Sequence, residues 1–461
     1  MSQVRPPNVL WILVEDMSPW MPAWGDCTVA TPNMERLASR GTVYQNCFSV
    51  APVCSPSRSG LICGCYPTRI GVHHHVGSRL EEPALELPEP IQTVPELFKA
   101  AGYFSYNLGK DDYNFIYDRE ALYHGAYETP KFYGHHHEGS VPFDLEDREW
   151  NYWRHRAEEQ PFFGQIGLWG GKNSRPPIHR VDRESVRVPA YYPDTEAFRE
   201  EIARHYECIK LVDWEVGQIL DALETDGLLE ETAIFLFSDH GMGALRHKQF
   251  CYDGGTHIPL MVSLPKGTKS GQCDKRLISN IDIAAASLGV AGVAIPEWMD
   301  AQNFLDESVE PRRSVVSARD RCDYTIDRIR SLRTTDYRYI RNFMTDRALM
   351  QPQYRDQWQT YRDLMRLAAV GGLTEAQALL ASKQRPAEEL YAVQDDPDEI
   401  HNLAEDPEMA SVLQAMRLEM DAWIRDTGDL GEQPESKAQL TALIDRWGVD
   451  RCVNPEYDLV K

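Results

Sequence analysis

The chain has 461 residues, enough to bury a large core and to form two or three structural units. Its 48 basic and 71 acidic side chains give a formal charge of −23, which argues against nucleic acid or an anionic membrane as a partner. Hydrophobic residues make up 42% of the chain, so general disorder is excluded. No apolar run approaches about eighteen residues, and we expect no membrane span.

The N-terminal residues 1–7 contain no signal peptide and lead directly into an apolar run. This favours the cytoplasm, or the periplasm or secretion if the chain has been trimmed. Ten cysteines occur without CxxC spacing or another regular framework, which indicates reduced thiols and no zinc site.

The first predicted strand is Asn8–Val14, a continuous apolar run typical of a buried parallel strand. It ends at Glu15 and Asp16. Carboxylates at the carboxyl end of a central strand lie where ligands bind in open α/β sheets. Adjacent carboxylates are hard to desolvate unless a cation lies between them, so a hard divalent metal is one explanation and a solvated acidic turn is the other.

The pentapeptide CSPSR, which begins at Cys54, has the composition of a helix start. Pro56 suits the first turn and Ser55 is a favoured cap, which predicts a helix from Pro56 to about Cys65. Cys54 would lie at the positive end of that helix, and Arg58 would return its side chain to the same face. A thiol in a cationic setting is typical of a reactive site, whereas a buried structural cysteine is the alternative.

Residues 54–58 resemble the Cys-x-Pro-x-Arg signature of type I sulfatases, and Ser59–Arg69 resembles the family's continuation, with Cys63 where threonine or serine is common. In that family the cysteine is oxidised after translation to formylglycine, whose hydrated aldehyde serves as the nucleophile. The resemblance extends to the Glu15–Asp16 pair, which stands where the family usually has two aspartates that bind a metal. Glu15 is longer by one methylene.

The predicted strand Phe104–Leu108 is followed by Lys110 and Asp112, where the family commonly has Gly-Lys-x-His. Lys110 matches, and a lysine there can pair a sulfate oxygen or assist the leaving group. Because Asp112 occupies the histidine position, either Asp112 takes over proton transfer or a histidine from elsewhere does. Of two histidine runs, His73–His75 either lines the pocket or decorates a loop, with a loop preferred, and His135–His137 is expected in a solvated loop.

The strand expected at Pro161–Leu168 resembles the family strand that ends in a histidine near the sulfate. Here Lys172 stands at that place. Lysine can donate a hydrogen bond to sulfate but is a poorer proton shuttle near neutral pH. A surface loop lysine is the alternative interpretation.

A second diagnostic strand, Thr232–Phe237, ends in Ser-Asp-His-Gly, so Asp239 and His240 fall at a strand end as Glu15 and Asp16 do. Together these four side chains could complete an oxygen-rich metal shell. The family pattern here is Ser-Asp-(Asn/His)-Gly, and both positions match.

The family pattern continues with Lys248. Arg246 and His247 make the local charge strongly positive, and His257 is expected to face the same pocket. A basic cluster in a chain of net charge −23 is not easily explained by solubility, so we expect these side chains near the substrate, with a solvated loop as the alternative.

The C-terminal part is expected to begin near residue 310. Thr335-Asp336, flanked by Ile329–Leu332 and Tyr337–Arg341, predicts a β-hairpin. Ten arginines and no lysine lie from Arg312 to Arg347, and both sulfate recognition and ion pairing on a sheet stay open for them. Glu388–Ala404 closely resembles the family's late signature. Other expected elements are strands at Thr42–Val50 and Leu260–Leu264, and helices from Thr31, at Val94–Ala101, Phe198–Glu224 and Ile278–Leu288, and within Asp356–Gln384.

Five motifs in family order identify the chain as a member of the sulfatase family. The resemblance implies an α/β fold of the alkaline-phosphatase type. We expect a catalytic domain over residues 1–310, with a central mixed sheet sandwiched by helices, and a smaller α+β subdomain with an antiparallel sheet over residues 311–461.

The family mechanism implies that formylglycine at Cys54 attacks sulfur in line, beside a Ca²⁺ or Mg²⁺ ion. The implied metal ligands are Glu15, Asp16, Cys54, Asp239 and His240. The implied catalytic residues are Cys54, Arg58, Lys110, Lys248 and Asp112, and the implied substrate-binding residues are Lys172, His257, Arg246 and His247.

The resemblance is nearest to bacterial heparan N-sulfatase-like enzymes, which implies a sulfate ester or sulfamate on a glycosaminoglycan-derived sugar. A formylglycine-generating enzyme would be needed for maturation. Two other enzyme classes of the same superfamily stay open, a phosphonate or phosphodiester hydrolase and an arylsulfatase. A degenerate sulfatase that binds sulfated glycans without turnover is the non-enzymatic alternative, suggested by the missing histidines at Asp112 and Lys172.

Overall fold

The computed structural model describes residues 5–76, 85–126, 150–173 and 180–461. The expected run His135–His137 lies outside them. The larger sheet has the strand order β4-β3-β5-β1-β6-β8-β2-β7, and β9 pairs with β2. Its strands are β1 (Asn8–Val14), β2 (Thr42–Phe48), β3 (Phe104–Leu108), β4 (Gly125–Ala126), β5 (Phe162–Leu168), β6 (Thr232–Ser238), β7 (His257–Ile258), β8 (Leu260–Ser263) and β9 (Gln272–Ser279).

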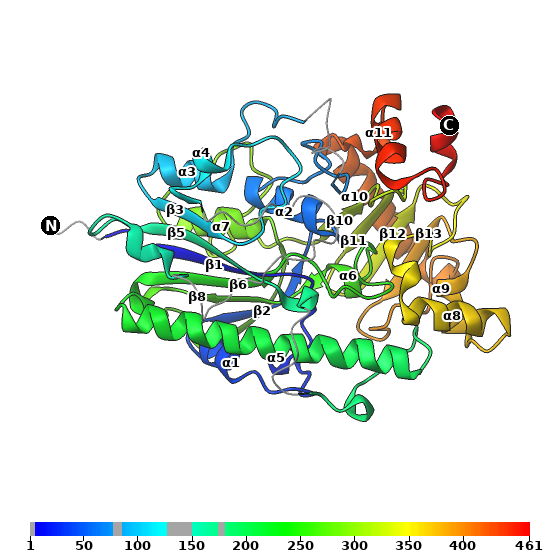
Figure 1. The fold of residues 1–461 in the computed structure, drawn as a ribbon, viewed down its shortest axis with the longest axis horizontal. Coiled ribbons are helices and arrows are strands. Elements are labelled where there is room, and N and C mark those ends of the chain that lie inside the picture. The colour runs from blue at the N-terminus through cyan, green and yellow to red at the C-terminus, as the bar shows by residue number, and fades with distance from the viewer. Residues whose placement is uncertain (1–4, 77–84, 127–149, 174–179) are drawn as a thin grey trace.

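Strand β1 lies at the centre of this sheet, parallel to both β5 and β6. Its side chains alternate between two buried faces, as the pleat requires. Leu10 and Ile12 pack in the same cluster as residues of α1 (Pro32–Ser39) and α5 (Glu196–Thr225). Val9 and Trp11 pack on the opposite face with α2 (Cys54–Cys63), α3 (Val94–Ala100) and α7 (Asp282–Val290). The sheet is therefore sandwiched by helices, as Figure 1 shows.

Trp11 ties the centre of the sheet to the helices on one face. Its ring packs edge-on against Phe163 at 5.1 Å and Phe237 at 5.6 Å, one from each neighbouring strand. Its Nε1 donates a hydrogen bond of 2.8 Å to Ser287 of α7. A fully buried tryptophan needs such a partner, so this contact fixes the position of α7 over the sheet.

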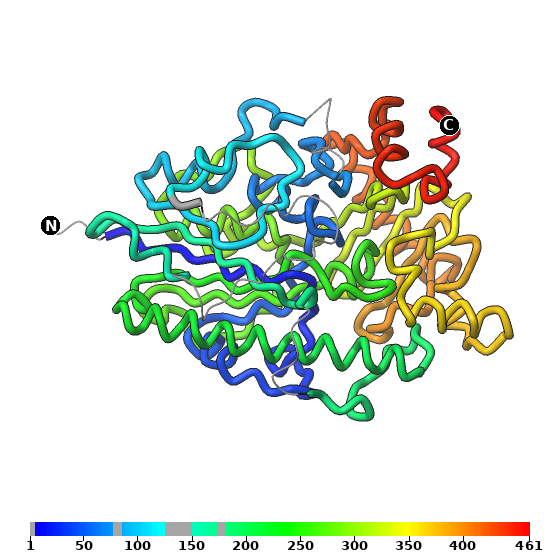
Figure 2. Tube along the Cα trace, viewed as in Figure 1, coloured from blue at the N-terminus to red at the C-terminus, as the bar shows by residue number. Residues whose placement is uncertain are grey.

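A separate antiparallel sheet has the order β10-β11-β12-β13. In Figure 2 the yellow-green to red part of the chain, which includes this sheet, gathers beside the end of the larger sheet that lies opposite the N-terminus. Its strands are β10 (Val315–Arg319), β11 (Ile329–Arg333), β12 (Tyr337–Asn342) and β13 (Glu388–Ala392), and the remaining helices are α4 (Arg119–Leu122), α6 (Asp253–Thr256), α8 (Gln359–Ala369), α9 (Glu375–Ala381), α10 (Ala410–Thr427) and α11 (Lys437–Trp447).

The expected α/β class with a second antiparallel sheet is confirmed, whereas the division at residue 310 stays a prediction. Two helices start at other residues than expected. Helix α2 begins at Cys54 and not at Pro56, because Ser57 donates its N–H to Val53 O at 3.2 Å. Residue Ile278 belongs to β9, and the following helix starts only at Asp282.

The segment expected to be helical lies between residues 356 and 384. It forms two helices, α8 and α9, which are separated at Gly371. This glycine has a φ of 67°, a backbone conformation that ends a helix and that favours glycine. Among the described residues, every helix is too short or too polar to cross a lipid bilayer.

Arg330 gives a test of the packing of the second sheet. Its guanidinium is fully buried and donates to Asp429 at 2.7 Å and to Asp320 at 3.1 Å. Removing one partner of a buried ion pair costs about 3–5 kcal/mol because the other charge stays buried. We expect Arg330→Ala to lower the free energy of unfolding by that amount in urea titrations.

The matched control is Arg425→Ala, since Arg425 pairs with Asp426 at 2.9 Å but is 70% exposed. Surface substitutions of this kind change stability by about 0.5 kcal/mol or less. Equal effects of the two variants would contradict the assignment of Arg330 as a buried structural cation.

Candidate active site

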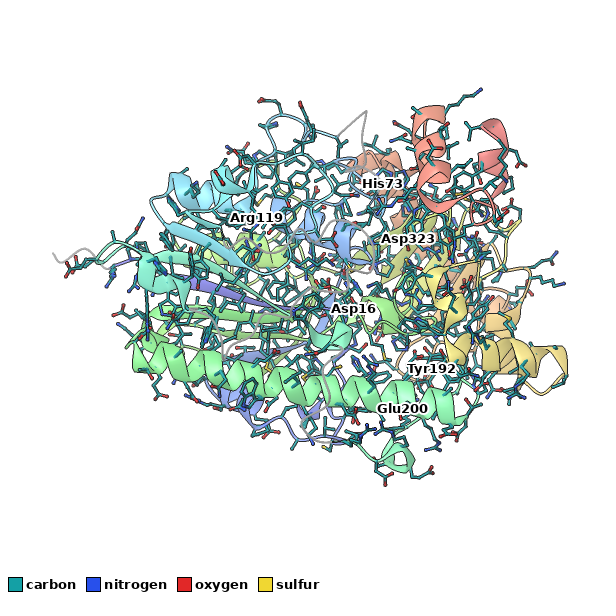
Figure 3. All side chains as sticks on the ribbon, viewed as in Figure 1. Asp16, His73, Arg119, Tyr192, Glu200 and Asp323 are labelled. Carbon is teal, nitrogen blue, oxygen red and sulfur yellow. The ribbon has the colours of Figure 1, made fainter. Side chains whose placement is uncertain are left out.

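The site begins where the carboxyl ends of β1 and β6 lie side by side. Val14 is in register with Ser238, so the residues that follow each strand meet at the same edge. Asp16 adopts a φ of 51° and donates its backbone N–H to Asp239 Oδ1 at 3.0 Å. Figure 3 shows Asp16 near the centre of the molecule, at the end of the sheet that faces the C-terminal part.

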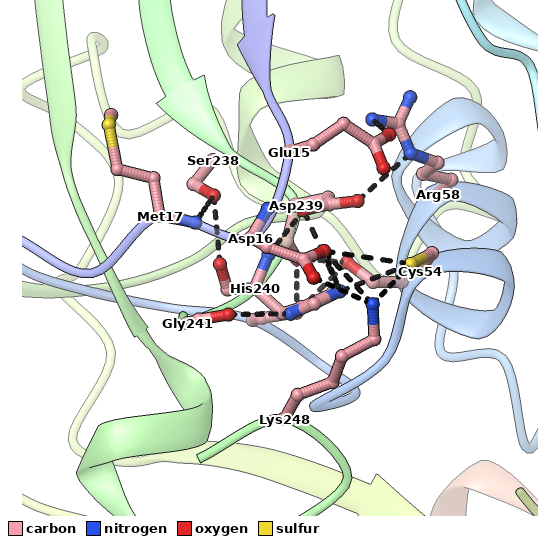
Figure 4. Close-up of polar contacts among 12 residues, drawn as sticks. Glu15, Asp16, Met17, Cys54, Arg58, Ser238, Asp239, His240, Gly241 and Lys248 are labelled. Carbon is pink, nitrogen blue, oxygen red and sulfur yellow. Dashed lines mark hydrogen bonds and ion pairs between the residues drawn. The ribbon is translucent and has the colours of Figure 1, made fainter. Parts of the chain in front are cut away.

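Helix α2 brings Cys54 to this edge. Ser49 and Ser57 donate their hydroxyls to the carbonyl oxygen of Asp239 at 2.9 Å and 2.6 Å, which fastens the start of the helix to the end of β6. As a result Cys54 Sγ lies 3.2 Å from His240 Nε2. Figure 4 shows Asp16, Cys54 and His240 converging from the ends of β1, α2 and β6.

Four of the converging residues could hold a metal ion. Ligand atoms of Asp16, Cys54, Asp239 and His240 all lie within 4.8 Å of one another. The Nδ1 of His240 is 2.8 Å from the carbonyl oxygen of Gly241, which leaves Nε2 directed into the group. Two carboxylates, an imidazole nitrogen and an oxygen at residue 54 after oxidation would suit a hard divalent cation, so the donor set fits the expected metal.

Glu15, which we expected among the metal ligands, lies outside this group. Its carboxylate contacts Lys110 at 3.1 Å and also accepts hydrogen bonds from Arg58 and Lys172. The carboxylate of Glu15 therefore lies among three cations.

Two lysines contact the sulfur of Cys54 directly. Lys172 donates to Sγ at 3.1 Å, and Lys248 donates to Sγ at 3.2 Å and to Asp16 Oδ2 at 2.8 Å. Arg58 donates its Nε to Asp239 Oδ2 at 3.0 Å. The expected residues Cys54, Arg58, Lys110, Lys172 and Lys248 are thus brought together.

The charges distinguish Cys54 from the other buried cysteines. Burial by itself would raise the pKa of its thiol, but Lys110, Lys172 and Lys248 hold that pKa well below its usual range. Burial instead raises the pKa of Cys63 well above the usual range. A buried thiol whose pKa is lowered by neighbouring cations is characteristic of a reactive position, which disfavours the structural interpretation of Cys54.

Three residues of the expected basic cluster lie elsewhere. Arg246 has its guanidinium 3.8 Å from the ring centre of Tyr252 and donates to a backbone carbonyl oxygen of the C-terminal part. The Nε2 of His247 is 2.8 Å from Tyr191 Oη, and burial lowers the pKa of His247 to about 3. The Nε2 of His257 is 2.7 Å from a carbonyl oxygen of β2.

These three side chains make packing contacts and do not contact Cys54. Arg246 adopts a left-handed backbone conformation, with a φ of 62°, so side chains adjacent in sequence need not face the same side. Asp112 pairs with Lys110 at 2.8 Å and lies beside the cationic group.

Two residues near Cys54 were not selected from the sequence. The Nδ1 of His75 is 3.0 Å from Asp323 Oδ1, and the next residue, Val76, donates its backbone N–H to Ser55 Oγ at 3.0 Å. The three-histidine run was the signal for His75, but a loop was the preferred interpretation. Asp323 is 248 residues away in sequence, and no motif marks it.

Comparison with known proteins decides the family. The profile of the family described as Sulfatase matches residues 7–293, more than half of the chain. The chain belongs to the sulfatase family. A second profile, N-sulphoglucosamine sulphohydrolase, C-terminal, matches residues 240–351 of this sulfatase. The family assignment from the sequence motifs is confirmed, and the chain is an enzyme of the sulfuric ester hydrolase type.

Relatives of this sulfatase act on sulfated sugars. It is 32% identical to an ulvan-active sulfatase from Formosa agariphila, over 94% of this chain and 77% of the relative. It is 26% identical to human N-sulphoglucosamine sulphohydrolase, over 93% and 92%. A solved structure in complex with its substrate, D-glucosamine-2-N,6-O-disulfate, has the same fold, with a TM-score of 0.67 at 17% identity over 93% and 100% of the two chains.

Lys248 gives a test of this site. Its ammonium group is buried and points at Cys54, where charge would develop on the sulfuryl oxygens. Removing one such donor typically lowers kcat by about 10²–10³-fold. We expect Lys248→Met to show that loss on a sulfate ester, whereas Lys275→Met, at an exposed position of β9, should keep wild-type kcat. Equal rates for the two variants would remove Lys248 from the site.

Proposed function

We propose that this sulfatase hydrolyses a sulfate ester or sulfamate on a sugar, with a glycosaminoglycan-derived sugar as the first candidate. The observation that carries the proposal is the buried Cys54 side chain, which Lys172 and Lys248 contact beside a metal-competent group. The choice of a sugar rests on the names of the relatives, which act on ulvan and N-sulphoglucosamine.

Each charged residue of the site has a separate role in this proposal. The ammonium groups of Lys172 and Lys248 would donate to the sulfuryl oxygens, since each already points at the nucleophile position. Arg58 would hold the carboxylate of Asp239 in place and add positive charge to the site. Glu15 would keep Lys110 and Lys172 oriented, because its buried carboxylate pairs with both ammonium groups.

We propose Ca²⁺ as the metal, with Mg²⁺ as second choice, held by Asp16, Asp239, His240 and the oxygen at residue 54. Oxygen ligands with one imidazole favour such hard cations. When bound, the ion would supply positive charge at the nucleophile and at the sulfate.

We also propose that Cys54 is converted to formylglycine by a formylglycine-generating enzyme. The hydrated aldehyde would supply an oxygen nucleophile with two hydroxyl groups. The lysines that lower the pKa of the Cys54 thiol are suited to stabilise charge on that oxygen as well.

A substrate panel tests the proposal. Defined sulfated mono- and disaccharides, O- and N-sulfated, are compared with an aryl sulfate and a phosphodiester. We expect the highest kcat/KM on a sulfated sugar. Preferential hydrolysis of the phosphodiester, or binding of sulfated glycans without turnover by the fully oxidised protein, would overturn it.

The metal assignment predicts different effects for two neighbouring acids. Asp239→Ala should weaken Ca²⁺ binding by more than about 100-fold in isothermal titration calorimetry. Mutation of a residue that only hydrogen-bonds to a metal ligand already lowers metal affinity by about 10–100-fold, and loss of a ligand should lower it further. Glu15→Gln should retain binding, since the Glu15 carboxylate pairs with cations. Chelation should abolish turnover and added Ca²⁺ should restore it. Loss of binding in Glu15→Gln to the same extent would return Glu15 to the ligand set.

If formylglycine at residue 54 is the nucleophile, kcat should be proportional to the fraction of protein in which residue 54 is oxidised. We expect wild-type protein made with and without the formylglycine-generating enzyme to differ in kcat in proportion to the aldehyde content, measured as the mass of the peptide that carries residues 49–58. Cys54→Ser should fold with an unchanged melting temperature and lose multiple turnover, because serine offers one hydroxyl in place of two. Full activity with an intact thiol would contradict this mechanism.

A further inference from the structure

Arg355 is a buried arginine whose hydrogen bonds differ from those of its neighbours in the C-terminal part. It lies in the short 3-10 turn Tyr354–Gln357, between β12 and α8, and its exposed fraction is 0%. Arg330 and Arg338 are equally buried and pair with carboxylates. Within the described part of the chain, the guanidinium of Arg355 donates to uncharged oxygens instead. Because a buried charge without a charged partner lowers stability, ion pairing does not explain this arginine.

The guanidinium of Arg355 is bound to the segment that carries Lys248. Its Nη2 donates to the carbonyl oxygen of Lys248 at 2.8 Å and to Oε1 of Gln249 at 3.0 Å. Its Nη1 donates to the hydroxyl oxygen of Tyr354 at 2.7 Å, which fixes the guanidinium plane. The arginine therefore holds the backbone of a residue whose ammonium group lies 3.2 Å from Cys54 Sγ.

The peptide group between Lys248 and Gln249 is held from both sides. Its carbonyl oxygen accepts from Arg355, and its N–H donates to the carbonyl oxygen of Pro52 at 2.6 Å. Gln249 adopts a φ of 73°, in the left-handed region that residues with a side chain rarely occupy. Such a conformation persists where the surrounding contacts hold it, so the two hydrogen bonds oppose a rotation of this peptide.

The position of the Lys248 side chain depends on this peptide. The N–H of Lys248 itself donates to the carbonyl oxygen of Met242 at 3.1 Å, so the backbone is held on both sides of the residue. Rotation of the peptide that follows would change the ψ of Lys248 and move its ammonium group away from Cys54. A misplacement of about 1 Å at a reacting group can lower a rate by about 10²-fold.

We propose that Arg355 is a positioning residue, which holds the catalytic Lys248 against the nucleophile. The inference rests on the proposed sulfatase function, in which Lys248 donates to the sulfuryl oxygens. Arg355 acts through the backbone of Lys248 and not by contact with the substrate. The C-terminal part thus contributes to catalysis through a hydrogen bond that joins residues 107 positions apart in the chain.

The main test is Arg355→Met, which removes the guanidinium and keeps an unbranched side chain. We expect kcat on a sulfate ester to fall by about 10²-fold, and by no more than it falls in Lys248→Met, with little change in KM. Loss of an interaction that acts in the transition state lowers kcat and kcat/KM together, so this pattern is the expected one. Wild-type kcat in folded Arg355→Met would overturn the proposal.

A double variant separates positioning of Lys248 from a general loss of structure. Because Arg355 acts through Lys248, the change Arg355→Met should lower kcat little further when Lys248→Met is already present. A full additional loss of about 10²-fold in that background would contradict the role of Arg355. If Arg355→Met does not fold, Arg355→Lys takes its place, since lysine keeps the charge but lacks the planar fork that reaches Lys248 and Tyr354 together. The same lack of additivity is then expected.

The matched control is Arg385→Met. Arg385 is also buried and donates to a backbone carbonyl oxygen, that of Met344, at 3.1 Å, whereas its other partner is Asp327. We expect this variant to have a lower melting temperature and, below that temperature, wild-type kcat. An equal loss of kcat in the two variants would show that both act by weakening the fold, which would refute a specific role of Arg355.

A second readout needs no turnover. Hydrogen–deuterium exchange, followed by mass spectrometry of the peptide that carries residues 248 and 249, reports on the N–H of Gln249. Local opening of a segment speeds exchange of its amides. We expect faster exchange of this peptide in Arg355→Met than in either the wild type or Arg385→Met. Exchange at the wild-type rate in Arg355→Met would show that Arg355 does not hold the peptide.

Failure of the proposed function and failure of this inference can be distinguished. If wild-type protein with oxidised residue 54 hydrolyses no sulfate ester or sulfamate, the proposed function fails, and exchange at Gln249 still tests the hold of Arg355 on the peptide. If it hydrolyses one and Arg355→Met does so equally well, the function stands and the role of Arg355 fails.

Discussion

Three carboxylates, those of Glu15, Asp16 and Asp239, are buried together at the carboxyl ends of two adjacent strands, each no more than 3% exposed. Carboxylates taken out of water must be paired. Four cationic side chains provide the pairing: Arg58, Lys110, Lys172 and Lys248. These cations come from separate segments of the chain, so the neutralisation of buried charge holds those segments in the arrangement that surrounds Cys54.

The same need for pairing organises the C-terminal part. Two uses were open for its arginine-rich stretch, sulfate recognition and ion pairing on the sheet. Arg330 pairs with Asp320 and Asp429 in the interior, and Arg338 pairs with Glu399 at 2.6 Å. Arginine forms such planar, buried contacts with carboxylates better than lysine does. For these two arginines the structure favours internal pairing. The ion pairs connect the second sheet to the segments that pack on that sheet.

Most of the fold could be predicted because apolar runs mark the central strands. β1 and β3 were predicted with their bounds, since each run stops at a charged or glycine residue. The metal-competent residues Asp239 and His240 were found because they follow such a strand. His257 was misplaced because net charge along a loop does not reveal the direction of each side chain. Asp323 could not be found, since its partner His75 is distant in sequence and the pair forms only when two separate parts of the chain meet.

Cys54 is 2% exposed and is fastened by its helix to the end of β6. An enzyme that oxidises this cysteine would have to bind the surrounding segment before it is folded, because Cys54 is inaccessible in the folded protein. Maturation and folding would therefore compete for the same chain, and the outcome would be decided kinetically during or soon after synthesis. A chain that folds before Cys54 is oxidised would stay folded but inactive. The rate of folding, and not only the stability of the fold, would therefore set the yield of active enzyme.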